Sequence, residues 1–390
     1  PAGAAPAQEA AAGSADRSLR ALSLEEAGLV SGGDGPAAGE PAIRVDGHLA
    51  EPAWEEASAA SDFRQREPDE GDPATEGTEV RVAYGSEALY VAVRARDDRP
   101  GKLIARTLER DRIMRASGFG GLQFRGDDAV AILFDTFHDH RNGIVFATNP
   151  NGAQFDALIT DQGQQINVEW RAVWEVEARR TDGGWTAEFR IPFRTLRYPS
   201  GRSATGGQTW GFNVSRMIRR KNEETLWTSW TRDGGGFLKV SRAGELTGLR
   251  DLPHAGLNLE VQPYVLSGVE EQRTEAGMPT DTRLKVGGNA KYELRPGLVL
   301  DLTANPDFAQ VEVDREQVNL TRFSLFFPEK RDFFLENAGI FDFGLRGFGN
   351  SPPPFLLFFS RRIGFHEGQT VPLMAGARLS GRVGSQTVGF

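Results

Sequence analysis

Residues able to hold a sugar are concentrated between His140 and Asp156, in the stretch "HRNGIVFATNPNGAQFD". Its polar side chains end in planar guanidinium, amide or carboxylate groups: Arg141, Asn142, Asn149, Asn151, Gln154 and Asp156. Groups of this shape can hydrogen-bond to the paired hydroxyls of a sugar ring, so we predict a carbohydrate site here. The central Asn-Pro-Asn-Gly is also a strong turn signal, and a hairpin without a ligand would use the same residues.

Tryptophans could supply the flat surface on which the CH groups of a sugar stack. The candidates are Trp170, Trp227 and Trp230. Trp227 and Trp230 stand three apart in "TLWTSW", and side chains alternate along a strand, so the two must point to opposite faces. We expect one of the pair to be buried and favour Trp230, beside the loop-like "TRDGGG", as the exposed platform. The remaining tryptophans alternate with apolar residues and are expected in the core: Trp54, Trp174, Trp185 and Trp210.

Acidic residues gather in turns, among them Asp127, Asp128 and Asp135. Calcium takes six to eight oxygen ligands, many of them from carboxylates, so these three could bind a calcium ion. Solvated turn residues are the alternative, because Asp also serves turns by bonding the local backbone. A glycosidase would need two carboxyls about 5–10 Å apart, and 54 acidic residues offer no way to choose a pair. We therefore assign no catalytic residue.

Composition narrows the classes of function further. The formal charge of -9 and the absence of a clustered basic stripe argue against nucleic acid as a partner. The chain has no cysteine, which excludes disulfides, thiolate catalysis and cysteine metal ligands. A run of about 18 apolar residues, as a membrane helix needs, does not occur, but strands that cross a membrane need only about 9–11 alternating residues.

Three regions differ in composition. Residues 1–40 are rich in Ala, Gly and Pro and are expected to be a disordered leader or linker. Residues 41–250 hold every tryptophan, and their short alternating segments, such as "EVRVAYG" and "ALYVAVRARDD", predict an antiparallel β-sandwich of jelly-roll type. In this pair of strands Val80, Val82, Val91 and Val93 should share an inner face.

Residues 256–390 show longer alternating segments. In "LNLEVQPYVLS" Leu, Val and Pro alternate with Asn, Glu and Gln, which is typical of membrane-barrel strands with lipid on one side and a polar lumen on the other. The region should hold about six strands, fewer than the eight or so of a single-chain outer-membrane barrel, so we expect an incomplete barrel. In "SLFFPEKRDFFLENAGIF" the aromatics would form the interfacial girdle of such strands. A second soluble sandwich is the alternative.

Two long motifs resemble known families. The run "IRVDGHLAEPAWEEA", with Asp46, Gly47, Trp54 and Ala57, resembles the start of a family 9 carbohydrate-binding-module-like domain, and the resemblance continues over residues 41–250. The run "NPDFAQVEVDREQVNLTRFSLFFPEKRDFFLENAGIF" resembles the barrel domain of unknown function that follows such modules in bacterial envelope proteins.

The resemblance implies an exported protein of the bacterial outer membrane, its signal peptide removed or outside this sequence, with the sandwich periplasmic or at the cell surface. Its partners would be a glycan and outer-membrane lipid, and related modules bind sugars, some with calcium. The leading hypothesis is non-catalytic carbohydrate binding in glycan recognition or uptake. The alternatives are an envelope glycoside hydrolase of carbohydrate catabolism and a structural or assembly protein without sugar binding.

Overall fold

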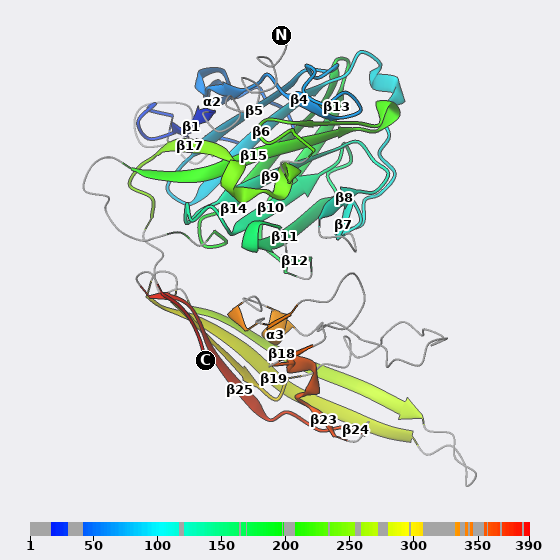
Figure 1. Ribbon diagram of the computed structural model, residues 1–390, viewed down its shortest axis with the longest axis vertical. Helices are drawn as coiled ribbons and strands as arrows, with labels where there is room; N and C mark the ends of the chain where they lie inside the picture. The colour runs from blue at the N-terminus through cyan, green and yellow to red at the C-terminus, as the bar shows by residue number, and fades with distance from the viewer. Residues whose placement is uncertain are drawn as a thin grey trace, which may run out of the picture. The chain divides into compact units, whose positions relative to one another are not determined.

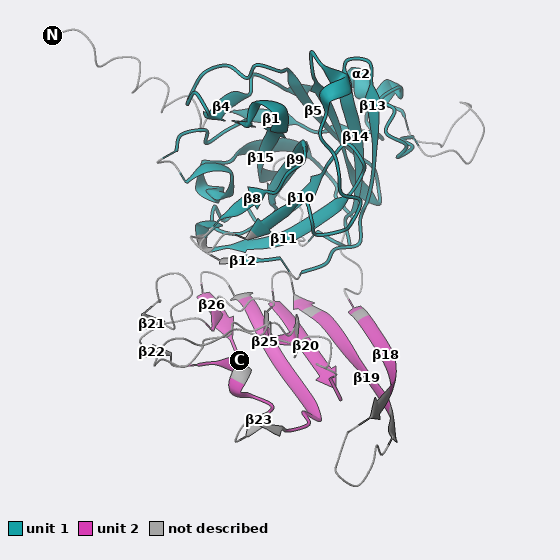
Figure 2. Ribbon diagram, turned by 90° about the vertical axis from the view of Figure 1, so that its right-hand side faces the viewer, with its two compact units in different colours: residues 1–255 teal, residues 256–390 magenta. Residues whose placement is uncertain are grey.

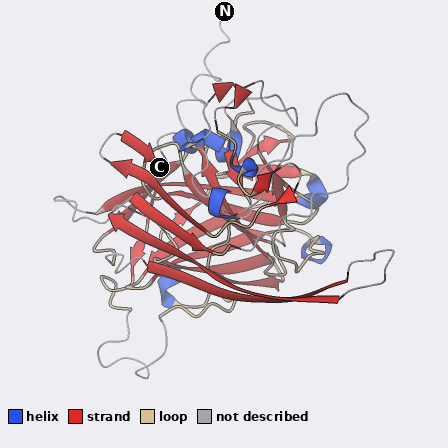
Figure 3. Ribbon diagram, turned by 90° about the horizontal axis from the view of Figure 1, so that it is seen from below, coloured by secondary structure: helices blue, strands red, loops and turns tan. Residues whose placement is uncertain are grey.

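The computed structural model divides the chain into two compact units, unit 1 (residues 1–255) and unit 2 (residues 256–390) (Figure 2). The residues that it describes are 17–29, 42–116, 121–163, 165–168, 170–196, 198, 207–232, 235–253, 259–271, 280–295, 298–306, 332–335, 340–341, 344–345, 355–356, 358–366, 369–383 and 386–390. Strands dominate them (Figure 3), and α-helix is limited in these ranges to α2 (Pro52–Glu56) and α3 (Asp332–Leu335). The predicted all-β class is therefore confirmed. Among the described helices, each is too short to span a membrane.

Unit 1 is a sandwich of two sheets (Figure 1). The larger has the order β1 (Ser18–Arg20), β17 (Gly244–Leu249), β15 (Gln208–Ile218), β9 (Ala129–Asp135), β10 (Gly143–Thr148), β11 (Gln154–Thr160) and β12 (Gln165–Asn167), with β16 (Glu223–Leu226) on β15 and β4 (Arg64–Glu67) on β16. The smaller has the order β13 (Glu175–Thr181), β14 (Gly184–Pro192), β6 (Ala88–Arg96), β5 (Thr78–Tyr84) and β2 (Leu22–Ser23), with β3 (Ala59–Ala60) on β5. A separate hairpin joins β7 (Met114–Ala116) and β8 (Leu122–Phe124).

The expectation of a disordered leader over residues 1–40 is wrong for its described middle part. Strands β1 and β2 lie within it and add parallel edges to the two sheets, β1 on β17 and β2 on β5. Leu19 is buried in the core between the sheets, which explains why this segment is held despite its polar surroundings in the sequence.

The core between the two sheets follows the predicted alternation. Val80 and Val82 of β5 and Val91 and Val93 of β6 are fully buried there, as predicted. From the larger sheet, Phe134 packs edge-on against Phe146 and Trp210 at centroid distances of 6.3 and 6.5 Å. The four tryptophans expected in the core are all buried: Trp54, Trp174, Trp185 and Trp210.

Both sheets also have an apolar outer face. On β9, Ala129, Ala131 and Leu133 point away from the core between the sheets and form a second cluster with residues such as Trp230 and Phe237. On the smaller sheet, Ala83 and Ala92 form a third cluster with Trp54 of α2. Since apolar surface gains about 25 cal/mol per Å² on leaving water, the connecting segments are held over these outer faces.

A buried carboxylate fixes the segment that carries the Asp-Gly and Trp motif. Glu188 of β14 accepts hydrogen bonds from the backbone N–H groups of Asp46 and Gly47 at 3.0 and 2.8 Å and from Trp54 Nε1 at 2.8 Å. Gly47 has φ +79°, and a Cβ there would lie 3.2 Å from Arg179 Cβ, so both the conformation and the space require glycine. Burial raises the pKa of Glu188 to about 7. The motif is thus explained by packing on the outer face of the smaller sheet.

Unit 2 has an open five-stranded antiparallel sheet among its described residues. The order is β18 (Leu259–Glu271), β19 (Thr280–Arg295), β20 (Leu298–Ala304), β25 (Ala375–Val383) and β26 (Gln386–Gly389). Two short hairpins accompany it, β21 (Gly344–Leu345) with β22 (Phe355–Leu356), and β23 (Phe365–His366) with β24 (Gln369–Thr370). The expectation that "SLFFPEKRDFFLENAGIF" forms a strand is wrong at residues 332–335, which are helix α3. Residues 324–331 and 336–339 lie outside the described residues.

We expect Glu188 to make unit 1 less stable at alkaline pH. Its folded pKa, about 7, lies above the ordinary value of 4.5, so its stabilisation is complete below pH 4.5 and is lost as the pH rises through 7. Between pH 5 and pH 8 this amounts to about 2–3 kcal/mol of unfolding free energy. Urea unfolding of Glu188→Gln should lack this component, whereas the exposed Glu56→Gln should keep it. Equal pH dependence in both variants would contradict the assignment.

Candidate functional site

The predicted polar hairpin exists, but two of its asparagines hold the turn itself. Asn149 is fully buried, and its Nδ2 donates to the Thr107 carbonyl at 2.9 Å and to Asp127 Oδ2 at 2.8 Å. Its Oδ1 accepts the backbone N–H groups of Asn151 and Ala153, and Asn151 Nδ2 donates to the Ala105 carbonyl at 3.1 Å. These amides join the β10–β11 turn to residues 105–107 and are committed to that task.

Arg141 and Asn142 lie at the other end of β10 from this turn, and both are exposed. Asn142 Nδ2 donates to Asp139 Oδ2 at 2.6 Å. The structure therefore does not bring the whole predicted set into one site, because six residues of strand separate its two ends.

The expected exposure of Trp230 is wrong. Trp227 is 3% exposed and Trp230 is 4% exposed. The two do belong to different clusters, Trp227 to the core between the sheets and Trp230 to the cluster on the outer face. Trp230 is buried because that face is covered, and the guanidinium groups of Arg17 and Arg64 lie 5.2 and 5.8 Å from its ring centroid.

The carboxylates of the three acids proposed for calcium accept hydrogen bonds from the backbone. Asp127 Oδ2 accepts the backbone N–H groups of Arg106 and Thr107, Asp128 those of Ile104 and Arg219, and Asp135 those of Asp139 and His140. Asp127 and Asp128 are used by the backbone of residues 104–107 and of Arg219, and Asp135 by the turn at residues 139–140, so the prediction of a shared calcium site is not supported by their geometry.

In the described part of the chain, the acidic group with ligand atoms close enough for one cation is Glu76, Asp97 and Asp98. Two side-chain cations already pair with it. Arg220 Nη2 lies 2.9 Å from Asp97 Oδ1, and Lys221 Nζ lies 2.7 Å from Glu76 Oε1. This group is thus a charge network at one end of the sandwich.

Two of the predicted residues, Trp170 and Asp156, are both neighbours of Phe146, and Asp156 pairs with an arginine that the sequence analysis did not single out, Arg110. The segment 170–174 runs from β12, at the edge of the larger sheet, to β13, at the edge of the smaller. The half-buried Trp170 packs edge-on against Phe146 at a centroid distance of 6.3 Å. Asp156 is fully buried, accepts the backbone N–H of Ala172, and pairs with Arg110.

Arg110 connects the polar groups of this edge. Its Nη1 donates to Gln154 Oε1 at 2.7 Å, and its Nη2 donates to the Ala172 carbonyl at 3.2 Å as well as to Asp156. Asp111 Oδ2 lies 3.9 Å from Arg110 Nε and 3.9 Å from Arg171 Nη2. Arg110, Asp111, Gln154, Asp156, Trp170 and Arg171 are hereafter called the edge site.

Burial governs the charges of the edge site. Burial raises the pKa of Asp156, while the backbone N–H of Ala172 and the charge of Arg110 oppose the shift. The pKa of Asp111 is also raised, first by burial and then by the negative charge of Asp156. Two exposed apolar side chains stand beside these polar groups in the chain, Leu108 at 75% and Val173 at 67% exposure. An indole, a guanidinium, carboxyls and an amide together are suited to hold a polyhydroxylated ring.

Residues 45–246 match the family model described as carbohydrate family 9 binding domain-like, which is more than half of the 390 residues. The chain belongs to this family. This match confirms the resemblance to family 9 that the Asp-Gly and Trp motif indicated. Residues 255–376 match a domain of unknown function (DUF5916). The resemblance of the second half to a family of unknown function is likewise confirmed.

Solved structures similar to the chain include a family 9 carbohydrate-binding module from Caldicellulosiruptor kristjanssonii in complex with cellotriose. It shares 13% identity, with 60% of this chain and 96% of that chain covered and a TM-score of 0.35. A family 9 module from the same organism in complex with glucose also shares 13% identity, with 60% and 98% covered and a TM-score of 0.36. No curated protein matches the chain.

We predict that Arg110→Ala destabilises the family 9 domain by about 2–3 kcal/mol, because Asp156 would remain buried without its cation. The loss should be larger at pH 8 than at pH 5, since the raised pKa of Asp156 lets it take up a proton as the pH falls. Urea unfolding at both pH values measures it.

The double variant Arg110→Ala/Asp156→Asn should recover part of this stability, because it removes the unpaired charge. The control is Arg171→Ala, whose side chain is 72% exposed and should contribute less than about 1 kcal/mol. A loss that is the same in the single and double variants would refute the role given to the ion pair.

Proposed function

We propose that the family 9 domain binds a glycan at the edge site without cleaving it. The observation that carries this proposal is the half-buried Trp170 two residues before Ala172, whose backbone is hydrogen-bonded to both Arg110 and Asp156. Membership in a family described as carbohydrate-binding supports it. Trp170 supplies the surface for the CH groups of the sugar, and the guanidinium, carboxyl and amide groups bind its hydroxyls.

The state of Asp156 supports binding over hydrolysis. A glycosidase needs two carboxyls free to donate a proton and to attack or activate water. Asp156 is fully buried, and its two oxygens accept from Arg110 and from the backbone of Ala172. Asp156 thus holds Arg110 in a fixed position. The other acid of this site, Asp111, is partly exposed.

We expect Trp170→Ala to weaken glycan binding at least about tenfold, equivalent to about 1.4 kcal/mol, because the stacking surface is lost. The whole chain in detergent is screened on a glycan array, and the best ligand is titrated calorimetrically. Trp230→Phe is the matched control, since Trp230 lies in the outer cluster and should affect stability only. Equal affinity of Trp170→Ala and the unaltered chain would remove the edge site from the proposal.

The glycan array, combined with an assay for released reducing sugar, separates the rival functions. Release of reducing sugar from the bound glycan, lost in Asp111→Asn, would favour an envelope glycoside hydrolase. Neither binding nor release would favour a structural or assembly role.

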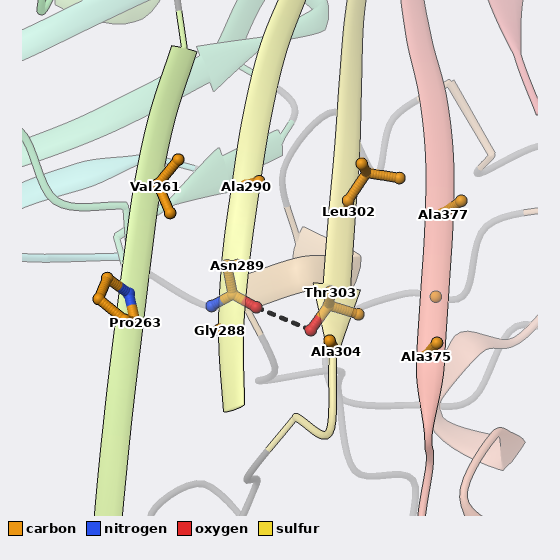
Figure 4. Close-up of a pocket in the computed structure, with 11 residues that line it drawn as sticks. Val261, Pro263, Gly288, Asn289, Ala290, Leu302, Thr303, Ala304, Ala375 and Ala377 are labelled. Atoms are coloured by element: carbon orange, nitrogen blue, oxygen red, sulfur yellow. Dashed lines mark hydrogen bonds between the residues drawn. The ribbon is translucent and has the colours of Figure 1, made fainter. Parts of the chain in front are cut away.

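Unit 2 supports a second proposal, that its sheet faces lipid. One face of the sheet is apolar and exposed, through Leu259, Val261, Val265, Leu284, Val286 and Leu302. Figure 4 shows part of this face, where Val261 of β18, Ala290 of β19, Leu302 of β20 and Ala377 of β25 lie side by side. Small residues such as Gly288 and Ala375 make it a shallow hollow.

The opposite face of the same sheet is polar, and part of it is buried. Asp301 is 2% exposed and pairs with Arg378 at 2.8 Å, and Thr303 Oγ1 donates to Asn289 Oδ1 at 2.7 Å. In water, burial favours the apolar face of a sheet, so this arrangement is inverted. An apolar outside and a polar inside are the pattern of strands in an outer-membrane barrel.

The protein is accordingly proposed to lie in the bacterial outer membrane, with the family 9 domain in the periplasm or at the surface and joined to unit 2 by the chain. Glycan binding by a domain tethered in this way would serve recognition or uptake of polysaccharide fragments. The rival, a second soluble sandwich, would need a further layer over the exposed apolar face, and the described residues of unit 2 supply none.

We predict that Val286→Asp impairs insertion into lipid vesicles, because a charge on the lipid face is destabilising, by about 2–4 kcal/mol for Arg or Lys near the middle of the bilayer and by less for Asp. The control is Lys285→Asp, the neighbouring residue on the opposite face. Insertion is measured by flotation with vesicles and by protease protection. Equal insertion of both variants would contradict a lipid-facing apolar face.

A further inference from the structure

The aromatic motif of unit 2 does not lie where the sequence analysis expected it. Its described parts are α3 and the pair Ile340–Phe341, and they contact the polar face of the sheet. The register places Gly376 opposite Thr303 and Gly389 opposite Ser380, so both glycines belong to the face that carries Asp301 and Arg378. The aromatics therefore meet the polar face and not a lipid interface.

Glycines make room for these contacts. A Cβ added to Gly376 would lie 3.1 Å from Phe333 Cζ. A Cβ added to Gly389 would lie 2.6 Å from Ile340 Cγ2 and 3.0 Å from Phe341 Cζ. The separation at Gly389 is shorter than real Cβ atoms show, and the one at Gly376 is tight, so residues larger than alanine at the two glycines would push against the aromatic segment.

The contact also involves the buried ion pair. The Arg378 guanidinium lies 5.3 Å from the centroid of the Phe333 ring, within reach of a cation–π interaction. Phe333 packs edge-on against Phe334 at 5.1 Å, and Phe341 packs against Phe358 at 5.9 Å. Arg378 is 6% exposed and Ser380 is fully buried, so water is excluded from this part of the polar face.

We infer that α3 and Ile340–Phe341 form a plug, a part of the chain that seals the polar face of the unit 2 sheet. The inference rests on the proposed membrane role, in which that face borders the aqueous interior. Aromatics over a polar lining close the path of water and of polar solutes along it. Displacement of the plug opens that path and exposes Asp301 and Arg378 to a polar solute, such as a sugar delivered by the family 9 domain.

Because the chain has no cysteine, the reactivity of a single introduced thiol can measure how well the plug shields the polar face from water. Ser380→Cys places it on the polar face near Gly389, and Val286→Cys places it on the apolar face. The whole chain is reconstituted in phosphatidylethanolamine–phosphatidylglycerol vesicles and treated with a water-soluble maleimide. The thiol at 380 should react slowly in the unaltered plug. The double variant Phe333→Ala/Phe341→Ala should accelerate its reaction about tenfold or more, because the weakened plug lets the maleimide reach the polar face.

Gly376→Val is a second route to the same result, because its side chain would push against the Phe333 ring although no aromatic residue is replaced. The matched control is Phe390→Ala, a terminal phenylalanine that is 79% exposed, which should leave the rate unchanged. Far-UV circular dichroism checks that each variant keeps its strands.

The outcomes separate this inference from the membrane proposal. An unchanged rate at position 380 in both folded plug variants would overturn the plug. Acceleration in both, with no change in Phe390→Ala, supports it. The thiol at position 286 tests the membrane proposal by itself, since lipid should shield it in every background, and fast labelling there in vesicles would overturn that proposal together with the membrane role of the plug.

Discussion

Both sheets of the family 9 domain are apolar on their two faces, and this constraint determines most of the rest of the domain. A sandwich needs only one apolar face per sheet, so the outer faces require cover from connecting segments. The segment with α2 covers the smaller sheet, where Glu188 fixes it through three hydrogen bonds. Residues around Trp230 and Phe237 cover the larger sheet. Trp230, which follows β16 in the chain, is buried as part of this cover.

The edge site follows from the same layering. Where segment 170–174 crosses from one sheet to the other, the backbone leaves regular pairing and its polar groups need partners. Asp156 and Arg110 supply them, through Ala172 in both cases. The polar groups that close the edge of the core are thereby held in fixed positions, and such pre-positioned groups would bind the proposed glycan at a lower entropic cost.

In unit 2, by contrast, it is the polar face of the sheet that is buried. Its ion pair between Asp301 and Arg378 is buried, while valines and leucines on the other face are exposed. A buried ion pair rarely adds stability in a soluble protein, because desolvation offsets the attraction. The Arg378 guanidinium of this pair lies over the Phe333 ring, and the glycines at 376 and 389 leave room for the aromatic residues on this face. The proposed placement of the apolar face in lipid would account for this arrangement.

The sequence by itself determined the all-β class, the inner faces of β5 and β6, the burial of four tryptophans and the family of the first unit, because alternation is a local property and long motifs are specific.

Only the tertiary structure decided which side chains form a site. Arg110 lies 46 residues from Asp156, and no local pattern relates the two. The exposure of Trp230 was wrongly predicted because strand alternation does not apply to it: β16 ends at Leu226, and Ser229, just before Trp230, has φ +60°. Likewise, the acids at 127, 128 and 135 suit a cation by type, yet all three accept hydrogen bonds from the backbone, two of them from residues 104–107 and the third from residues 139–140. Cover and pairing depend on contacts between distant segments, which composition and spacing do not encode.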